Sequence, residues 1–276
     1  TVNDRVNQYL SRFTEWTDYQ HKVLANIHGT LMPVPFNHRS LKLAFGEEKG
    51  EKLYQKLVAT FGENKKVPIM ELREKNDPEL VEVADYVFEN VFLHYTMKQW
   101  GQTPDQIDPS VTGRVPIFIG DDDRYFPQAP YQGMPAEGYT ALFERMLDHD
   151  LIDVFCGVDA RDVFRIGETN VHVCGKCYGG EIVYTGPLDE LFGLDLGALP
   201  YRTLDMRFET LEMDRFQPVG TVNYTTSEDF TRILDRVVNL TNFHPVGRLA
   251  EYRYYDMDAV TDSALNLSDE IIAYHA

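Results

Sequence analysis

The chain has 276 residues, of which 43% are hydrophobic and 25% are charged, a composition typical of a globular protein with a sizeable core. Its formal net charge of −18 argues against nucleic acid and an anionic membrane as partners, because both repel an acidic protein. The 3 cysteines imply no disulfide framework, and we find no signal peptide and no apolar run that could span a membrane. We therefore expect a cytoplasmic protein.

The amino-terminal part of the chain predicts a helix and a β-hairpin. Apolar residues at three- and four-residue spacing predict a helix over residues 3–16, with Asn3 as its cap. Polar and apolar residues then alternate across a turn at His28–Gly29, which predicts a hairpin that Pro33 and Pro35 end at a sheet edge.

Helical spacing continues over residues 40–100. Gly62 is expected to stop one helix, and Asp77–Pro78 is expected to start another. Periodic apolar residues on this last helix are expected in the core: Leu80, Val83, Ala84, Val87, Phe88, Val91 and Phe92.

The second half of the chain predicts mainly strands. RVPIFIG reads as a strand and GYTALFERMLDH as a short helix, and the two segments DVFCGVDARDVFRIG and NVHVCGKCYGGEIVYTGP are expected to be rich in β-structure. LPYRTLDMRFETLEM and PVGTVNYT alternate as antiparallel strands do, and the closing part passes from a Gly–Arg loop into a helix.

The stretch from His94 to Gly133 gathers aromatic residues, glycines and prolines around Arg114. Aromatic planes and a planar guanidinium are the groups that bind a flat ring joined to an anion. Composition alone favours a packed core with Arg114 at the surface, whereas the lack of helical or strand periodicity favours a shaped loop. Further candidates for anion binding lie beside aromatic or glycine residues: Arg202, Arg232 and Arg248.

Other motifs carry weaker signals. Cys174 and Cys177 form half of a zinc pattern, but a tight hairpin between strands is the better interpretation, and we predict no metal. The run Asp121–Asp123 is expected to be a solvated loop. The chain contains no GxSxG nucleophile turn and no GxGxxG pyrophosphate cradle.

Taken together, several blocks of the chain resemble the UDP-galactopyranose mutases. In order they are YTMKQWG, GRVPI, DRYF, YQGMP, IVYTGPLDELF, GALPYRTL, VNYT, DFTRILD and GRLAEYRYYDM. The resemblance implies an isomerase of cell wall biosynthesis that converts UDP-galactopyranose to UDP-galactofuranose, with reduced FAD as cofactor. In that family flavin N5 attacks the anomeric carbon, UDP leaves, and the sugar opens and recloses as the smaller ring.

The resemblance also implies roles for individual residues. Arg114 and Arg232 would be catalytic and would grip the diphosphate from two sides, and Tyr95 would stack on uracil. Further contacts to the substrate would come from Phe92, Thr96, Gln99, Trp100, Tyr125, Phe126, Arg202, Asn223 and Tyr254. The flavin would be contacted by Arg248, Tyr255, Asp256 and Met257.

The predicted fold class is α+β, a helical bundle plus an antiparallel β-sheet, with a remnant of a Rossmann-like FAD domain at the C-terminus. Residues 1–39 would join the sheet domain, 40–113 form the helical bundle, 114–235 the substrate-binding sheet, and 236–276 the loop and helix of the FAD domain. The UDP-sugar is the expected partner, and a homodimer is left open.

Two departures from the family pattern leave alternatives open. The chain starts just after the strand, Gly-rich turn and helix that hold the FAD diphosphate in the family, and RVVNLTNFHPV replaces a longer segment before Gly247. We therefore expect the isolated chain to bind FAD weakly or not at all. The alternatives are a truncated mutase, a non-catalytic UDP-sugar-binding or interaction module that has lost FAD, and, less favoured, a glycosyltransferase-associated domain.

Overall fold

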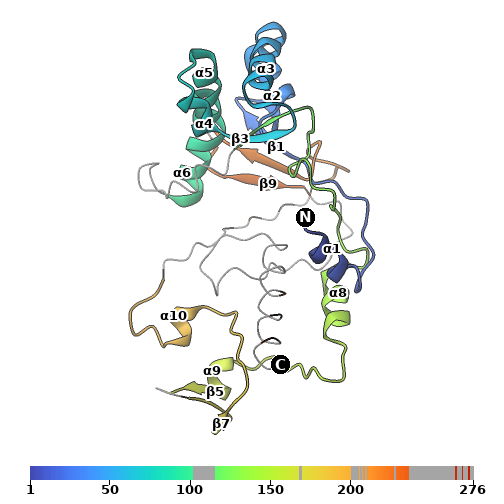
Figure 1. Ribbon diagram of the computed structural model, residues 1–276, viewed down its shortest axis with the longest axis vertical. Coiled ribbons are helices and arrows are strands. Elements are labelled where there is room, and N and C mark those ends of the chain that lie inside the picture. The colour runs from blue at the N-terminus through green and yellow to red at the C-terminus, as the bar shows by residue number, and fades with distance from the viewer. Residues whose placement is uncertain are drawn as a thin grey trace.

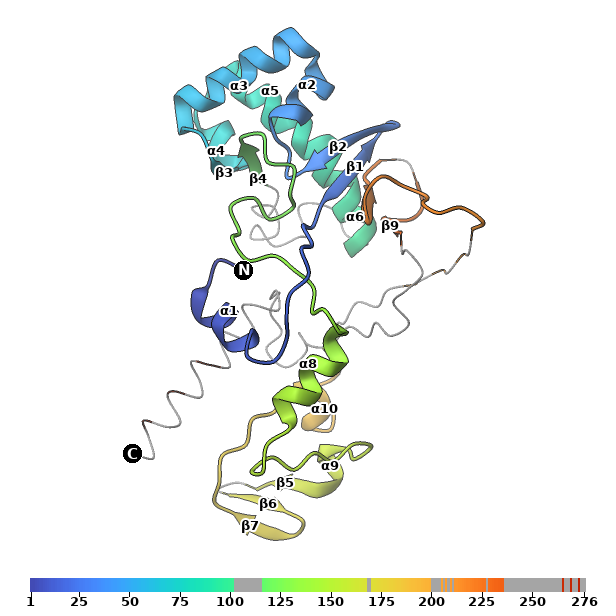
Figure 2. The same ribbon diagram turned by 90° about the vertical axis from the view of Figure 1, so that its right-hand side faces the viewer.

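The computed structural model describes residues 1–101, 116–167, 170–199, 211–226 and 228–235, with the single residues Asp205, Arg207, Glu209, Leu265, Asp269 and Ala273. A body of helices and sheet lies at one end of its longest axis, and a small three-stranded sheet lies at the other (Figure 1). The view turned by 90° shows the same separation, with α1 and the N-terminus between the two ends (Figure 2).

The first helix is shorter than the sequence predicts. α1 spans Asp4–Leu10, and the Asn3 side chain accepts a hydrogen bond from the Val6 N–H, so the predicted cap is confirmed. The expected extension to residue 16 is wrong, because the chain tightens after Leu10 into a turn in which Phe13 N–H donates to Leu10 O at 3.0 Å. Trp16 instead bridges to Pro135.

The predicted hairpin is confirmed, but Pro33 lies within its second strand, which ends at Val34, so only Pro35 lies beyond that end. β1 (Val23–Ile27) and β2 (Thr30–Val34) pair antiparallel, and His28 and Gly29 have φ angles of 49° and 88°. Two successive left-handed residues match the twist of the flanking strands. The four-stranded sheet has the order β2-β1-β8-β9, so β2 lies at its edge, where a proline costs no ladder hydrogen bond.

The sheet is mixed, which corrects the expectation of an antiparallel sheet. β8 (Thr221–Tyr224) runs parallel to β1, with Val23 opposite Thr221, and β9 (Arg232–Leu234) pairs antiparallel with β8. The parallel pair joins segments about 200 residues apart, so the long intervening chain makes the crossover that parallel strands require.

The predicted helices around Gly62 and Asp77–Pro78 form as expected, with one strand inserted. Gly62 ends a helix at a φ of 86°, and Asp77 caps the next helix. Val67 and Pro68, expected to begin a helical segment, instead belong to β3 (Lys65–Pro68), because this strand pairs with β4 (Pro116–Ile119), the predicted RVPIFIG strand. The helices are α2 (His38–Phe45), α3 (Glu47–Phe61), α4 (Ile69–Glu74), α5 (Pro78–Val87), η1 (Phe88–Leu93) and α6 (His94–Trp100).

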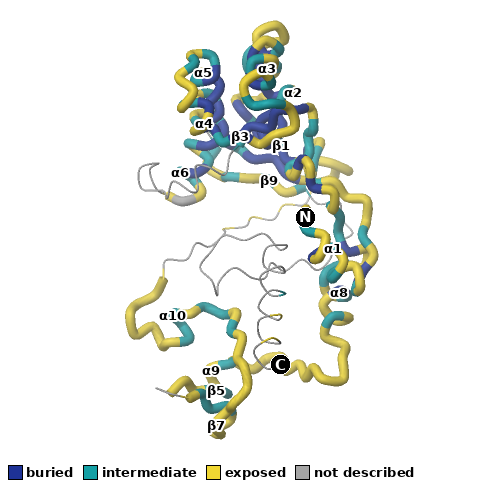
Figure 3. Tube along the Cα trace, viewed as in Figure 1, coloured by how far each residue is buried: buried dark blue, intermediate teal, exposed yellow. Residues whose placement is uncertain are grey.

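The core of the described chain lies where these helices meet the sheets (Figure 3). The predicted apolar stripe is buried, apart from Phe88, which packs partly buried against the core. Most of this stripe forms one buried apolar cluster with Ile117 and Ile119 of β4 and with Ala25 and Ile27 of β1. The apolar periodicity therefore identified the inner face of α5 and η1 correctly.

The other end of the molecule has little buried surface. α8 (Gly138–Leu147) is the predicted short helix, and its Leu142 is buried, but none of the described residues of 151–199 is. The expected β-rich region contains only β5 (Phe164–Ile166), β6 (Val171–Val173) and β7 (Lys176–Tyr178), beside the short helices α9 (Ala160–Val163) and α10 (Leu188–Leu191). Cys174 and Gly175 form the predicted tight turn between β6 and β7.

The elements are compatible with an α+β fold. No described element tests the Rossmann-like remnant, and the domain boundaries at residues 39, 113 and 235 stay predictions. Most of LPYRTLDMRFETLEM and of the closing segment lies outside the described residues. Among the described helices, none combines the length and the apolar character that a bilayer crossing needs.

Candidate functional site

The candidate site begins on α6, the end of the continuous helical segment formed by α5, η1 and α6. η1 closes π-type turns, a local departure from the α-helix that is frequent at functional sites. The side chains of Phe92 and Thr96 are covered, at 2% and 4% exposure, whereas Tyr95 is half-buried and Gln99 is exposed. Tyr95 and Gln99, four residues apart, therefore share the accessible side of the helix.

The hairpin of β8 and β9 brings an arginine to this side of α6. Asn223 on β8 lies opposite Arg232 on β9, and Arg232 Nε donates to Asn223 Oδ1 at 2.7 Å. Arg232 Nη2 donates to the Tyr95 hydroxyl at 3.0 Å. Three predicted site residues from three elements, Arg232 as a catalytic residue and Tyr95 and Asn223 as substrate contacts, therefore form one hydrogen-bonded group, which we call the Arg232 cluster.

The guanidinium of this cluster retains its charge and part of its donor capacity. Arginine has five N–H donors, and the described contacts of Arg232 occupy Nε and one donor on Nη2. Among the described residues, no carboxylate forms an ion pair with Arg232, and its side chain is exposed. The remaining donors can therefore form a planar fork for an anionic ligand.

His21 lies beside two further predicted substrate residues, Tyr125 and Phe126. Its ring centroid lies 5.5 Å from that of Tyr125 and 6.2 Å from that of Phe126, and its carbonyl accepts from the Tyr125 N–H at 2.8 Å. Burial and the positive charge of Arg232 lower the pKa of His21 below its ordinary value.

Sequence reasoning missed His21, because a single histidine before a strand has no distinguishing pattern. Its Nδ1 lies 2.9 Å from the Tyr19 hydroxyl, so Tyr19, Tyr125 and Phe126 surround the imidazole. The only available signal was the aromatic residue two positions upstream. That signal does not identify Tyr125 and Phe126 as ring partners, because they follow His21 by 104 and 105 residues.

The acidic run before Tyr125 is a loop, as predicted, and Asp121 is exposed, but its carboxylates also bind protein groups. Asp121 Oδ1 lies 2.7 Å from His38 Nδ1, and Asp123 accepts from the Asn37 amide at 2.9 Å. Asp122 binds Arg124, which lowers the pKa of the Asp122 carboxyl. The Asp121 and Asp123 carboxylates are therefore structural, since they bind the loop that carries Tyr125 and Phe126 to residues at the N-terminus of α2.

Several predicted site residues lie outside the described part of the chain. They are Arg114, Arg202, Arg248, Tyr254, Tyr255, Asp256 and Met257, and the side chain of Trp100 is likewise not described. The predicted pair of Arg114 with Arg232 therefore stays a prediction. Within the described residues, no group of three His, Cys, Asp or Glu side chains could hold a metal ion, and Cys174 and Cys177 are exposed thiols.

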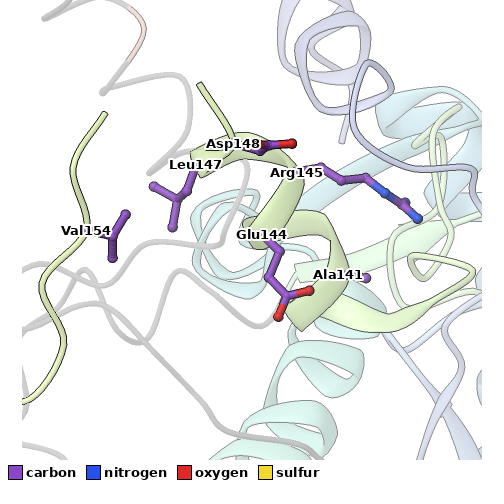
Figure 4. Close-up of a pocket in the computed structure, with 6 residues that line it drawn as sticks. All are labelled: Ala141, Glu144, Arg145, Leu147, Asp148 and Val154. Carbon is purple, nitrogen blue, oxygen red and sulfur yellow. The ribbon is translucent and has the colours of Figure 1, made fainter. Parts of the chain in front are cut away.

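A hollow of about 540 Å³ lies on α8 rather than on the elements of the Arg232 cluster (Figure 4). It is lined by Ala141, Glu144, Arg145, Leu147, Asp148 and Val154. Arg145 already pairs with Glu137 and donates to Phe13 O at 3.1 Å. The hydrogen bonds and free charge of the Arg232 cluster are stronger indications of a ligand site than this open hollow, whose cation is already paired.

Comparison with known proteins gives an independent result. A family model described as "GLF: UDP-galactopyranose mutase" matches residues 90–238, which include Tyr95, Asn223 and Arg232. The chain is 25% identical to the UDP-galactopyranose mutase of Mycoplasma pneumoniae, over 99% of this chain and 81% of the relative. It is 26% identical to a probable UDP-galactopyranose mutase of Klebsiella pneumoniae, over 99% and 79% of the two chains.

A further relative has a different nucleotide in its name. The chain is 25% identical to the dTDP-fucopyranose mutase of Escherichia coli, over 96% of this chain and 81% of the relative.

Proposed function

Because this chain belongs to the UDP-galactopyranose mutase family, we propose that it binds a UDP-sugar and interconverts UDP-galactopyranose and UDP-galactofuranose. The family model matches more than half of the chain. The names of the relatives from Mycoplasma pneumoniae and Klebsiella pneumoniae support the same substrate.

The observation that carries the proposal is the Arg232 guanidinium, held between Tyr95 and Asn223 with no described carboxylate to neutralise it. In a protein with a net charge of −18, an anionic ligand needs a local cation to overcome the overall field. Arg232 meets this need, because two neutral acceptors orient it without cancelling its charge.

The residues of the cluster would act mainly on the nucleotide. The Arg232 fork would bind the diphosphate and would stabilise the negative charge that UDP acquires as it separates from the sugar. Tyr95 presents an aromatic ring beside that fork, which supports its proposed stacking on the uracil. Tyr125 and Phe126, held by the loop fastened to α2, would limit the access of water to the sugar.

Flavin chemistry is the less supported part of the proposal. The residues expected at the flavin lie outside the described chain, and no described strand leads into a helix through a GxGxxG turn. The described residues therefore do not form the pyrophosphate cradle of a flavin dinucleotide. Reduced FAD, when bound, supplies the nucleophile in this family.

The proposal is tested by calorimetric titration of the full chain with UDP. Arg232→Met should weaken UDP binding about ten- to 150-fold, because hydrogen bonds to a charged group contribute roughly 1.5–3 kcal/mol. Arg161→Met removes the same charge from α9, where Arg161 pairs with Asp159, and should leave UDP affinity unchanged. No UDP binding by the wild type, or equal binding by Arg232→Met, would refute the proposed site.

A turnover assay distinguishes a catalytic mutase from a non-catalytic UDP-sugar-binding module. Because the isolated chain is expected to bind FAD weakly, reduced FAD is supplied in large excess, and the mutase should then convert UDP-galactofuranose to UDP-galactopyranose, as followed by chromatography. UDP binding without conversion supports the non-catalytic UDP-sugar-binding module instead. A parallel titration with dTDP shows whether the base site prefers uracil or thymine, a choice raised by the name of the Escherichia coli relative.

A further inference from the structure

A lysine on α6 holds the loop that leads to Arg232. Lys98 Nζ donates to the backbone carbonyls of Tyr224, Glu228 and Phe230, at 2.8, 3.0 and 3.2 Å. An ammonium group has three donors, so these carbonyls use its full capacity. The contacts join residues 126 to 132 positions apart in the chain.

This environment differs from that of a surface lysine. Among the described residues, Lys98 forms no ion pair with a carboxylate, whereas Lys49, Lys52 and Lys56 all do. The side chain is half-buried, and burial lowers the pKa of Lys98 although Glu228 and Asp229 partly oppose the change. The ammonium therefore replaces water as the partner of three peptide groups in the loop between β8 and β9.

The position of Lys98 relative to Arg232 gives these bonds a consequence for the site. Lys98 follows Tyr95 by three residues, so both side chains leave nearly the same side of α6. Phe230, whose carbonyl Lys98 binds, precedes Arg232 by two residues, and the Tyr224 and Phe230 rings pack edge to face at 4.8 Å. The hairpin is thus attached to α6 twice, by Lys98 at its loop and by Arg232 at β9.

We propose that Lys98 is a positioning residue that holds the loop between β8 and β9 on α6 and thereby sets the place of the Arg232 guanidinium. The proposal rests on the proposed function, in which Arg232 binds the diphosphate. Without the lysine, three carbonyls lose their donor and the loop can move away from α6. Arg232 then meets Tyr95 and the ligand in a wider range of positions, and the diphosphate binds more weakly.

The test is a double-mutant cycle on the full chain, with UDP as the titrant at constant salt. Lys98→Met keeps most of the aliphatic stem and removes the donors, and we expect UDP binding to weaken about tenfold. If Lys98 acts through Arg232, adding Lys98→Met to Arg232→Met should weaken binding less than about twofold further. Lys52→Met, on α3, is the matched control and should leave UDP affinity unchanged.

The outcomes test the positioning role of Lys98 and the proposed function separately. Equal UDP affinity in Lys98→Met and the wild type, or additive losses in the double variant, overturns the positioning role. Additive losses would mean that the ammonium attracts the ligand directly. If UDP binding does not depend on Arg232, the proposed function fails instead.

A second variant covers the case in which Lys98→Met does not fold, which circular dichroism would show. Lys98→Gln keeps an amide that can donate to two carbonyls and lacks the charge. It should weaken UDP binding less than tenfold and show the same non-additivity with Arg232→Met. A full additive loss in this variant overturns the proposal as well.

Discussion

The resemblance assigns Phe92 and Phe126 to the same substrate pocket, but in the structure Phe92 is buried and Phe126 is exposed. Truncation of the two side chains should therefore have different effects. Phe92 in η1 is 2% exposed and lies 5.6 Å from the Phe88 ring, whereas Phe126 is 37% exposed. Replacing a fully buried phenylalanine by alanine removes its burial and leaves a cavity, which costs about 3–5 kcal/mol. Phe126→Ala loses mainly contacts with Tyr125 and His21, which should cost about 1 kcal/mol.

The assay is urea unfolding followed by circular dichroism, together with UDP titration of each variant under native conditions. We expect Phe92→Ala to lower the free energy of unfolding by about 3–5 kcal/mol. Phe126→Ala should change stability little and weaken UDP binding. The reasoning is refuted if Phe92→Ala keeps the wild-type unfolding midpoint and loses UDP affinity, because Phe92 would then be a ligand contact and not a core residue.

Two other substitutions test the electrostatics and the packing. Arg232→Met should raise the pKa of His21, measured by NMR titration, because the arginine charge and burial together lower that pKa. An unchanged pKa would show that the Arg232 charge does not act on His21. In the wild type the folded state favours the neutral imidazole, so stability should fall as pH drops below the ordinary His21 value of 6.5. Gly50→Ala should lower the melting temperature, because the added Cβ would lie 2.6 Å from the Lys42 Cα, and this overlap of α3 with α2 outweighs a gain of about 1 kcal/mol in helix propensity. A higher melting temperature than that of the wild type would contradict the packing of these helices, and Glu48→Ala, exposed on α3, serves as the control.

Local structure followed from the sequence where a single residue type has a strong backbone preference. Asn3 caps α1, Gly62 ends α3, and the turns at His28–Gly29 and Cys174–Gly175 lie where residue pattern predicts them. In each case the cause lies within a few residues, in a side-chain oxygen that accepts a backbone N–H or a residue that adopts positive φ. The apolar spacing of α5 and η1 likewise identified the buried stripe.

The sequence misled where a distant partner decided the local structure. Val67 and Pro68 open a segment predicted to be helical, but pairing with β4 places them in a strand. The Asp121–Asp123 run has the composition of a solvated loop, yet the N-terminus of α2 supplies Asn37, His38 and Arg39 as its partners. In both cases the partner lies far away in the sequence, so the neighbouring residues do not predict it.

By itself, the sequence determined the family, the caps Asn3 and Asp77, the inner face of α5 and η1, and the kinds of side chain that a nucleotide-sugar site would use. Only the tertiary structure decided which of those side chains meet: Arg232 with Tyr95 and Asn223, and His21 beside Tyr125. It also decided that Lys98 binds peptide carbonyls and not a carboxylate. The physical reason is that a carbonyl or hydroxyl acceptor looks the same at every position of the chain, and only folding selects the ones that come within 3 Å of a given donor.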